Sequence, residues 1–90
     1  MDIYEMQDLY KQFEGRWCRI YFVGEGSTLL KILKVSGDNL LCQNVHGSKK
    51  LISTYDIKNL EEFSGIIRAS GEAVQNGLVV SVQKAIQDAK

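Results

Sequence analysis

Between Arg16 and Phe63, closely spaced turn signals divide the chain into short apolar runs, and this pattern limits the possible folds more than any other feature. The runs are rich in β-branched and aromatic residues, which favour strands, and Gly, Ser, Asp and Asn residues separate them. The connections are too short for the crossover helices that parallel neighbours would need. The pattern therefore predicts a mainly β fold, a small five-stranded antiparallel barrel. The predicted strands are Trp17–Val23, Thr28–Val35, Leu40–Val45, Leu51–Ser53 and Ile57–Leu60.

A short amphipathic helix is predicted ahead of the strands, from about Asp2 to Glu14. Asp2 can cap its first turn, and Glu5 stands three residues later, as in a capping box. Gly15 follows where a helix needs a C-terminal stop. Apolar residues recur at intervals of three and four, which places them on one helical face. They are Ile3, Met6, Tyr10 and Phe13.

The last third of the chain differs in composition, and its apolar residues predict a helix over about residues 72–89. Val74, Leu78, Val82 and Ile86 recur every four residues, which is one face of a helix. Gly77 would cost this helix ~1 kcal/mol relative to alanine. We therefore expect residues 1–63 to form the N-terminal helix plus barrel, and residues 64–90 a C-terminal helical extension of the same domain.

The length and composition indicate how so small a domain can be stabilised. A chain of 90 residues buries only about two-thirds of its unfolded surface, so it needs disulfides, a metal or partner subunits. Cys18 and Cys42 lie within apolar strands and do not resemble a disulfide framework. With one histidine besides, they do not make a credible metal site. We expect no cofactor and favour self-association.

The start of the chain is acidic, which is unlike a secretory signal. No apolar run approaches the ~20 residues that cross a membrane. These features predict a cytoplasmic protein with reduced thiols and no membrane partner.

The order of helix, strands and turns resembles the Sm-like family, which includes the Sm, Lsm and bacterial Hfq proteins. The resemblance covers roughly residues 2–63, and an SH3-like barrel, which shares this strand rhythm, is the structural alternative. The first motif is alternating apolar residues before a glycine turn, followed by an Asp or Asn before the third strand. The second is an apolar pair, a tight corner and a closing apolar residue. The positions that match these motifs are Ile20, Phe22, Gly26, Asp38, Asn39, Leu51, Ile52 and Ile57.

The resemblance implies a cyclic homo-oligomer of about five to seven subunits, in which the fourth strand of one subunit pairs with the fifth strand of the next. It also implies single-stranded RNA as a partner. In such rings the second-to-third turn and the fourth-to-fifth corner line the pore. The RNA-binding candidates are Asp38 and Asn39 in the turn, Ser53, Thr54 and Tyr55 in the corner, and the basic loop residues Lys49 and Lys50.

Simpler interpretations of these residues stay open. Asp38 and Asn39 are also an ordinary turn pair, Tyr55 an ordinary edge residue, and Lys49 and Lys50 an ordinary solvated hairpin. The zero formal net charge is unusual for a protein that grips phosphates, so a structural or adaptor ring that binds protein is the alternative. We predict no enzyme, because the sequence offers no nucleophile with a base and an orienting group.

Overall fold

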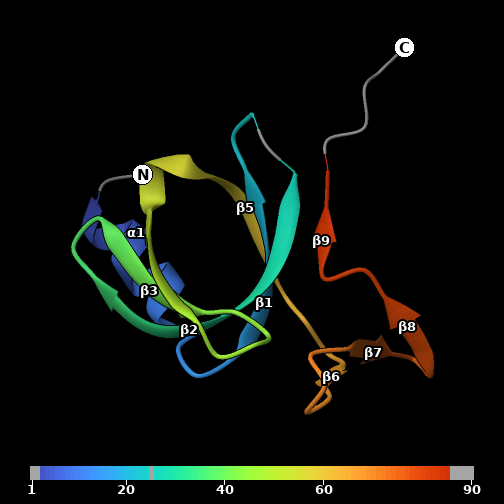
Figure 1. Cartoon of the computed structure of the whole chain (residues 1–90). Helices are drawn as coiled ribbons and strands as arrows, with labels where there is room; N and C mark the ends of the chain where they lie inside the picture. The colour runs from blue at the N-terminus through green and yellow to red at the C-terminus, as the bar shows by residue number, and fades with distance from the viewer. Residues whose placement is uncertain (1–2, 25, 86–90) are drawn as a thin grey trace.

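A computed structural model describes residues 3–24 and 26–85 of the chain (Figure 1). It is mainly antiparallel β, which confirms the predicted mainly β class, and among the described residues the main sheet has six strands where five were predicted. The N-terminal helix lies within the predicted range, and no helix in the described part is long and apolar enough to span a membrane. The elements are α1 (Ile3–Lys11), β1 (Trp17–Phe22), β2 (Ser27–Ser36), β3 (Asn39–Gln43), β4 (Lys49–Ser53), the 3₁₀ helix η1 (Thr54–Asp56), β5 (Ile57–Glu62), β6 (Ile66–Ile67), β7 (Ala73–Gln75), β8 (Leu78–Val80) and β9 (Gln83–Lys84).

The main sheet has the strand order β4-β3-β2-β1-β5, and β9 pairs in addition with β2. β2 is the longest strand and has two halves. Its first half pairs with β1, and its second half pairs with β3 after a register shift between Ile32 and Lys34. Such a bulge increases the local bend and twist of a strand. β2 contains no glycine that could ease a bend. The bulge therefore accounts for the strong curvature of the sheet in Figure 1.

The main core lies on the concave side of this sheet. Strand residues alternate between its two faces, so every second apolar side chain is buried. Tyr10 and Phe13 pack against the core from α1 and the residues after it. The Oε2 atom of Glu14 accepts a hydrogen bond from the backbone N–H of Val35 at 2.7 Å, which fixes this end of the helix to β2. The buried residues are Cys18, Ile20, Leu30, Ile32, Val35, Leu40, Cys42 and Ile52.

The predicted C-terminal helix is wrong for residues 72–85, because this segment forms strands β7, β8 and β9. β6, β7 and β8 make a second antiparallel sheet, and β9 joins β2. The β7–β8 turn explains the difference, since Asn76 and Gly77 have φ values of 53° and 78°. Positive φ at both central residues is typical of a two-residue hairpin turn, for which Asn-Gly is a strong signal. Residues 86–89 of the predicted helix lie outside the described part.

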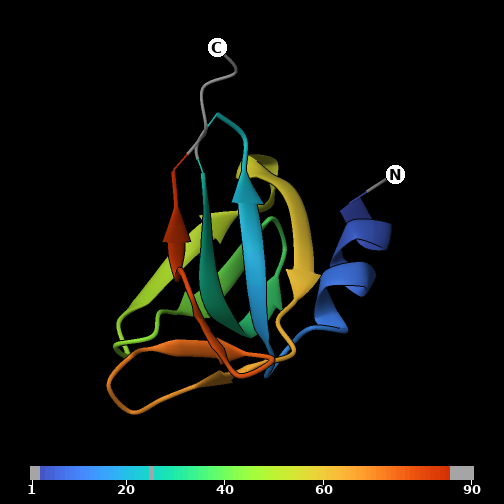
Figure 2. The ribbon, with the colours of Figure 1, turned by 90° about the vertical axis from the view of Figure 1, so that its right-hand side faces the viewer.

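The C-terminal strands cover the convex face of β1 and β2. Figure 2 shows β9 alongside β2 and the small sheet across one end of the molecule. A second core forms beneath them from Leu29, Phe63 and Ala73, with exposed fractions of 0%, 8% and 0%. Because this cover is largely complete, the 64–90 segment is part of the same packed unit as the main sheet over its described residues.

Candidate functional site

The β2–β3 turn and the β4–β5 corner meet at one end of the main sheet. The backbone N–H of Thr54 donates to the carbonyl of Asp38 at 2.7 Å, and Asn39 is the register partner of Ser53. Within the corner, the hydroxyl of Ser53 accepts from the N–H of Tyr55 at 3.2 Å and caps η1. Five of the seven residues predicted to bind RNA are thus brought together.

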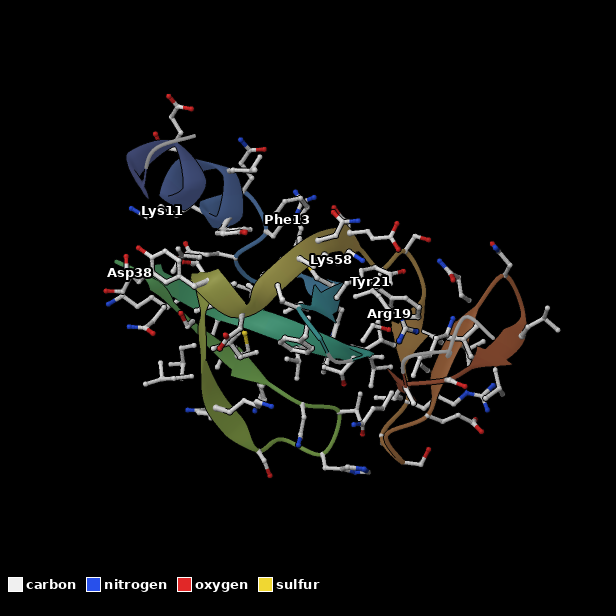
Figure 3. The ribbon with its side chains drawn as sticks, turned by 90° about the horizontal axis from the view of Figure 1, so that it is seen from above. Lys11, Phe13, Arg19, Tyr21, Asp38 and Lys58 are labelled. Carbon is white, nitrogen blue, oxygen red and sulfur yellow. The ribbon has the colours of Figure 1, made fainter. Side chains whose placement is uncertain are left out.

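These five residues differ in how far they can reach a ligand. Tyr55 is 70% exposed, and Asn39 is also exposed. Thr54 is only 4% exposed, so its side chain is part of the packing and not a ligand contact. Asp38 and Ser53 are half-buried and hold the two loops against each other. Figure 3 places Asp38 at the end of the molecule away from Arg19 and the C-terminal strands. Tyr55 and Asn39 are therefore the two side chains of this group that are exposed to solvent.

Lys49 and Lys50 lie elsewhere, at the start of β4. Their register partners in β3 are Gln43 and Cys42, which are next to the β3–β4 turn. Both lysines are exposed. Because β4 runs from these lysines to Ser53, its whole length separates them from the corner. The structure thus does not group the predicted basic residues with the predicted base-contacting residues.

The β3–β4 turn is held by its own side chains. The Oδ1 atom of Asn44 accepts from the backbone N–H groups of His46 at 2.9 Å and Ser48 at 3.0 Å. The His46 ring packs against Gly71, where an added Cβ would lie 2.7 Å from the ring atom Cε1. This histidine therefore helps to seat the C-terminal segment against the turn.

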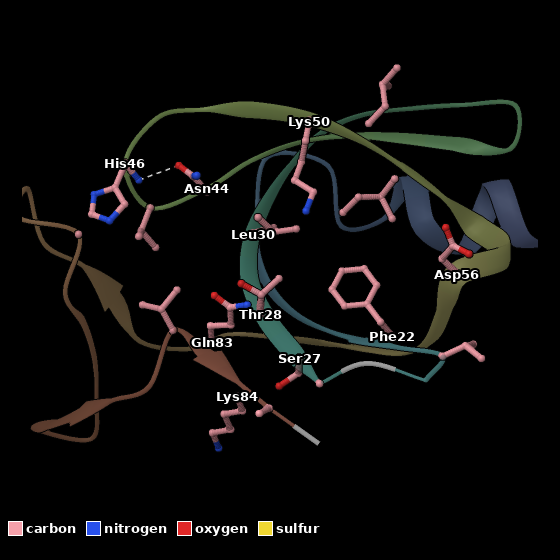
Figure 4. Close-up of a pocket in the computed structure, with 18 residues that line it drawn as sticks. Phe22, Ser27, Thr28, Leu30, Asn44, His46, Lys50, Asp56, Gln83 and Lys84 are labelled. Carbon is pink, nitrogen blue, oxygen red and sulfur yellow. Dashed lines mark hydrogen bonds between the residues drawn. The ribbon is translucent and has the colours of Figure 1, made fainter. Parts of the chain in front are cut away.

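Sequence reasoning missed a large cleft between β4 and the start of β2, with a volume of about 930 Å³. Figure 4 shows Lys50 and Phe22 pointing into it, with Leu30 on its floor and Thr28 and Gln83 across from Lys50. Its walls come from three distant parts of the chain: the β1–β2 region, the β3–β4 region and β9 with its neighbours. The last of these was predicted to be helical, so no pattern in the sequence pointed to the cleft.

Neither cysteine has the properties of a reactive group. Cys18 and Cys42 are fully buried free thiols. Burial raises the pKa of Cys18 to about 12, with a smaller contribution from Glu62, and burial raises the pKa of Cys42 to about 11. Both are therefore protonated at neutral pH, and a thiol reacts as its thiolate. In the part of the chain that the structure describes, no three His, Cys, Asp or Glu residues are placed to hold a metal.

Comparison with protein-family models, with curated proteins and with solved structures gave no match to this chain.

Proposed function

We propose that the protein is an Sm-like, ring-forming, RNA-binding protein of the cytoplasm. The single observation that carries the RNA-binding part is the position of Tyr55, 70% exposed at the corner that also holds the exposed Asn39. An exposed aromatic ring can stack on an unpaired base, a contact worth about 1–3 kcal/mol. The amide of an exposed asparagine such as Asn39 can read the edge of a base.

The ends of the main sheet support the assembly part of the proposal. β4 and β5 are the terminal strands of the order β4-β3-β2-β1-β5, so among the described strands each has one unpaired edge. An exposed edge invites pairing with another chain. Joining β4 of one subunit to β5 of the next would occupy both edges and close a ring of identical contacts.

The charges along these two edges are complementary. β4 begins with the exposed Lys49 and Lys50, and β5 ends with the exposed Glu61 and Glu62. In an antiparallel pair, the first residues of one strand lie beside the last residues of the other. Lys49 of one subunit would then lie near the glutamates of the next. Opposite charges across strands favour pairing and like charges oppose it.

Solution mass by light scattering tests the assembly. We expect one species of about five to seven times 10.1 kDa. A clean monomer over the working concentration range would contradict the ring.

Binding of fluorescent poly(U) and poly(A) in a salt series tests the RNA part. We expect Tyr55→Ala to weaken binding by about 5- to 150-fold, which corresponds to the loss of one stacked base. Tyr55→Phe is the matched control, because it keeps the ring and should keep the affinity. Affinity should also fall as salt rises, in proportion to the phosphate contacts made. No binding at any salt concentration would contradict an RNA ligand.

A second candidate is an adaptor ring that binds protein, and the small C-terminal sheet favours it. β8 is an end strand of that sheet, and its Leu78 and Val79 are 70% and 62% exposed. Apolar side chains on an open strand edge are typical of protein contacts. The same salt series separates the candidates, because an adaptor leaves poly(U) and poly(A) unbound throughout.

A further inference from the structure

The cleft between β4 and the start of β2 has the size of a small-molecule site and is lined by both apolar and polar groups. Its volume of about 930 Å³ falls within the ~300–1,000 Å³ that such sites occupy. Apolar groups make its floor, and Leu30 is 2% exposed there. A few polar side chains project from the walls, among them Thr28 and Gln83, which are register partners on β2 and β9. The lining is about as polar as it is apolar, so polar contacts would set much of a ligand's orientation here.

Two charged side chains of opposite sign, Lys50 and Asp56, line the cleft at different places. Lys50 projects into it from the part of β4 next to the β3–β4 turn (Figure 4). Among the described residues its ammonium group has no hydrogen-bond or ion-pair partner. Asp56 borders one end, where its carbonyl accepts from the N–H of Val23 at 2.9 Å. The cleft thus has Lys50 between His46 and Asp56, with the carboxylate toward one end, and Lys84 on the β9 wall extends away from Lys50.

An aromatic ring lies between Lys50 and Asp56. Phe22 ends β1, is half-buried and points into the cleft (Figure 4). Its register partner Ile57 follows Asp56 directly, which places the ring toward the carboxylate end. Flat ligands gain from offset stacking or edge contacts with such a ring, beyond the apolar area that they bury.

We propose that this cleft binds a small molecule that has a flat ring and a single anionic group. The anionic group pairs with Lys50, the ring lies against Phe22 and Leu30, and Gln83 and Thr28 bond to polar atoms on the ring. Asp56 repels a second anionic group and favours a hydrogen-bond donor at the far end of the ligand. Nucleoside monophosphates and aromatic carboxylic acids share this chemistry. The proposal uses neither Tyr55 nor Asn39, the residues that carry the RNA-binding proposal, and it assigns Lys50 to a small-molecule anion in place of RNA.

Titration of the full chain by NMR, following backbone amide shifts, tests the site. The probes are UMP, AMP, benzoate and the uncharged nucleoside uridine, each up to about 10 mM. We expect at least one of the three anions to bind saturably, with the largest shifts at Thr28, Leu30 and Gln83. Uridine should bind at least about tenfold more weakly than UMP if nucleotides are the ligand. Binding of benzoate alone would identify aromatic acids as the source and would equally support the site.

Two charge-removing variants decide whether Lys50 is the anchor. Lys50→Gln should weaken the best anion by about tenfold or more, because it removes a charge-assisted contact. Lys34→Gln is the matched control, since Lys34 is exposed on β2 and outside the cleft. Lys50→Met repeats the test with the aliphatic stem retained, and a thermal melt of each variant shows that it is folded. Absence of saturable binding by all three anions, shifts centred outside the cleft, or equal losses in Lys50→Gln and Lys34→Gln would each overturn the proposal.

Discussion

Arg19 holds the C-terminal segment through two carbonyls more than 60 residues away in sequence. Its guanidinium donates from Nη2 to the carbonyl of Ser81 at 2.6 Å and from Nη1 to the carbonyl of Val82 at 2.9 Å. The residue is 8% exposed and lies on the convex face of β1. Leu29, its register partner on β2, is fully buried in the second core, and its backbone N–H also donates to Val82. These contacts fix the point at which the C-terminal strands return to the main sheet.

Replacing Arg19 with alanine should lower the free energy of unfolding by about 2 kcal/mol. Hydrogen bonds from a charged donor contribute about 1.5–3 kcal/mol. The Ser81 carbonyl would lose the Arg19 donor, while the Val82 carbonyl would keep its bond from the Leu29 N–H. Denaturant unfolding measures the change. The control is Arg68→Ala, which removes an exposed ion pair with Glu72 and should cost less than about 1 kcal/mol. Equal effects of the two variants would show that the Arg19 contacts add nothing beyond a surface charge.

Replacing Gly26 with alanine should separate β9 from β2. A Cβ at this position would lie 1.6 Å from the carbonyl oxygen of Lys84, so the backbone of β9 must move. Hydrogen exchange should become at least about tenfold faster at the amide of Leu29, which donates to Val82. Amides in the β2–β3 half of the sheet, such as that of Val35, serve as the internal control. Unchanged exchange at Leu29 would mean that β9 pairing does not depend on the missing side chain.

Truncating Ile20 to alanine should cost about 2–5 kcal/mol, the usual range for a buried aliphatic residue. Ile20 is fully buried at the centre of β1 and of the main core. The comparison is Val79→Ala on β8, where the side chain is 62% exposed and the cost should stay within about 0.5 kcal/mol. Thermal unfolding at a fixed protein concentration measures both. A small loss for Ile20→Ala would contradict the packing of the main core.

The two buried thiols predict a decline in stability at high pH. Burial raises the pKa of Cys18 to about 12 and that of Cys42 to about 11, from ordinary values near 9. Above pH 9 the unfolded chain can release these protons while the folded chain keeps them. The free energy of unfolding therefore falls as the pH rises. The stabilising contribution of the neutral thiols is therefore complete below pH 9 and is lost as pH rises through 11. Urea unfolding at a series of pH values should show this fall, and Cys42→Ala should show less of it.

The same burial should protect the thiols from alkylation. Iodoacetamide reacts with thiolates, and neither cysteine ionises or reaches solvent in the folded chain at pH 8. Mass spectrometry should find both sites unmodified in buffer and both modified in urea. Rapid labelling of either site in buffer would contradict its burial.

Exchanging charges between β4 and β5 tests the proposed subunit contact. Lys49→Glu and Glu61→Lys each place like charges across the proposed strand pair, and each should reduce the assembled fraction measured by light scattering by about tenfold. The double variant restores opposite charges and should recover the assembly. If the wild type, both single variants and the double variant all have the same mass, this pair of edges is not the contact.

β1 to β5 were predictable because each is a short run that contains apolar residues and lies between turn residues, and β1 is also rich in β-branched and aromatic residues. The predicted first strand, 17–23, differs from β1 by one residue at its end, and the predicted second strand, 28–35, differs from β2 by one residue at each end. The corner at residues 54–56 is also where η1 occurs. Local backbone preference and the final fold agree in these places, so a prediction from the sequence is correct there.

The C-terminal segment was not predictable from its apolar spacing alone. Val74, Leu78 and Val82 recur every four residues, but Asn76 and Gly77 reverse the chain between the first two. The turn signal decides the structure, because a helix cannot pass through two consecutive residues with positive φ. The cleft was unpredictable for a related reason, since one of its walls is β9. By contrast, the meeting of Asp38 with Thr54 was expected from the resemblance, whereas the burial of Thr54 depends on packing.

β2 pairs with three other strands, and one of these partners is synthesised much later than β2 itself. β2 pairs with β1, β3 and β9, and the last of these lies more than 50 residues after Ser27. At about 5–20 residues per second, a ribosome needs several seconds to make the chain between them. Through that interval Leu29 and the convex face of β1 and β2 have no cover. We therefore expect the nascent chain to expose this apolar surface until its last strand emerges, and to be most prone to aggregation when synthesis stops short of β9.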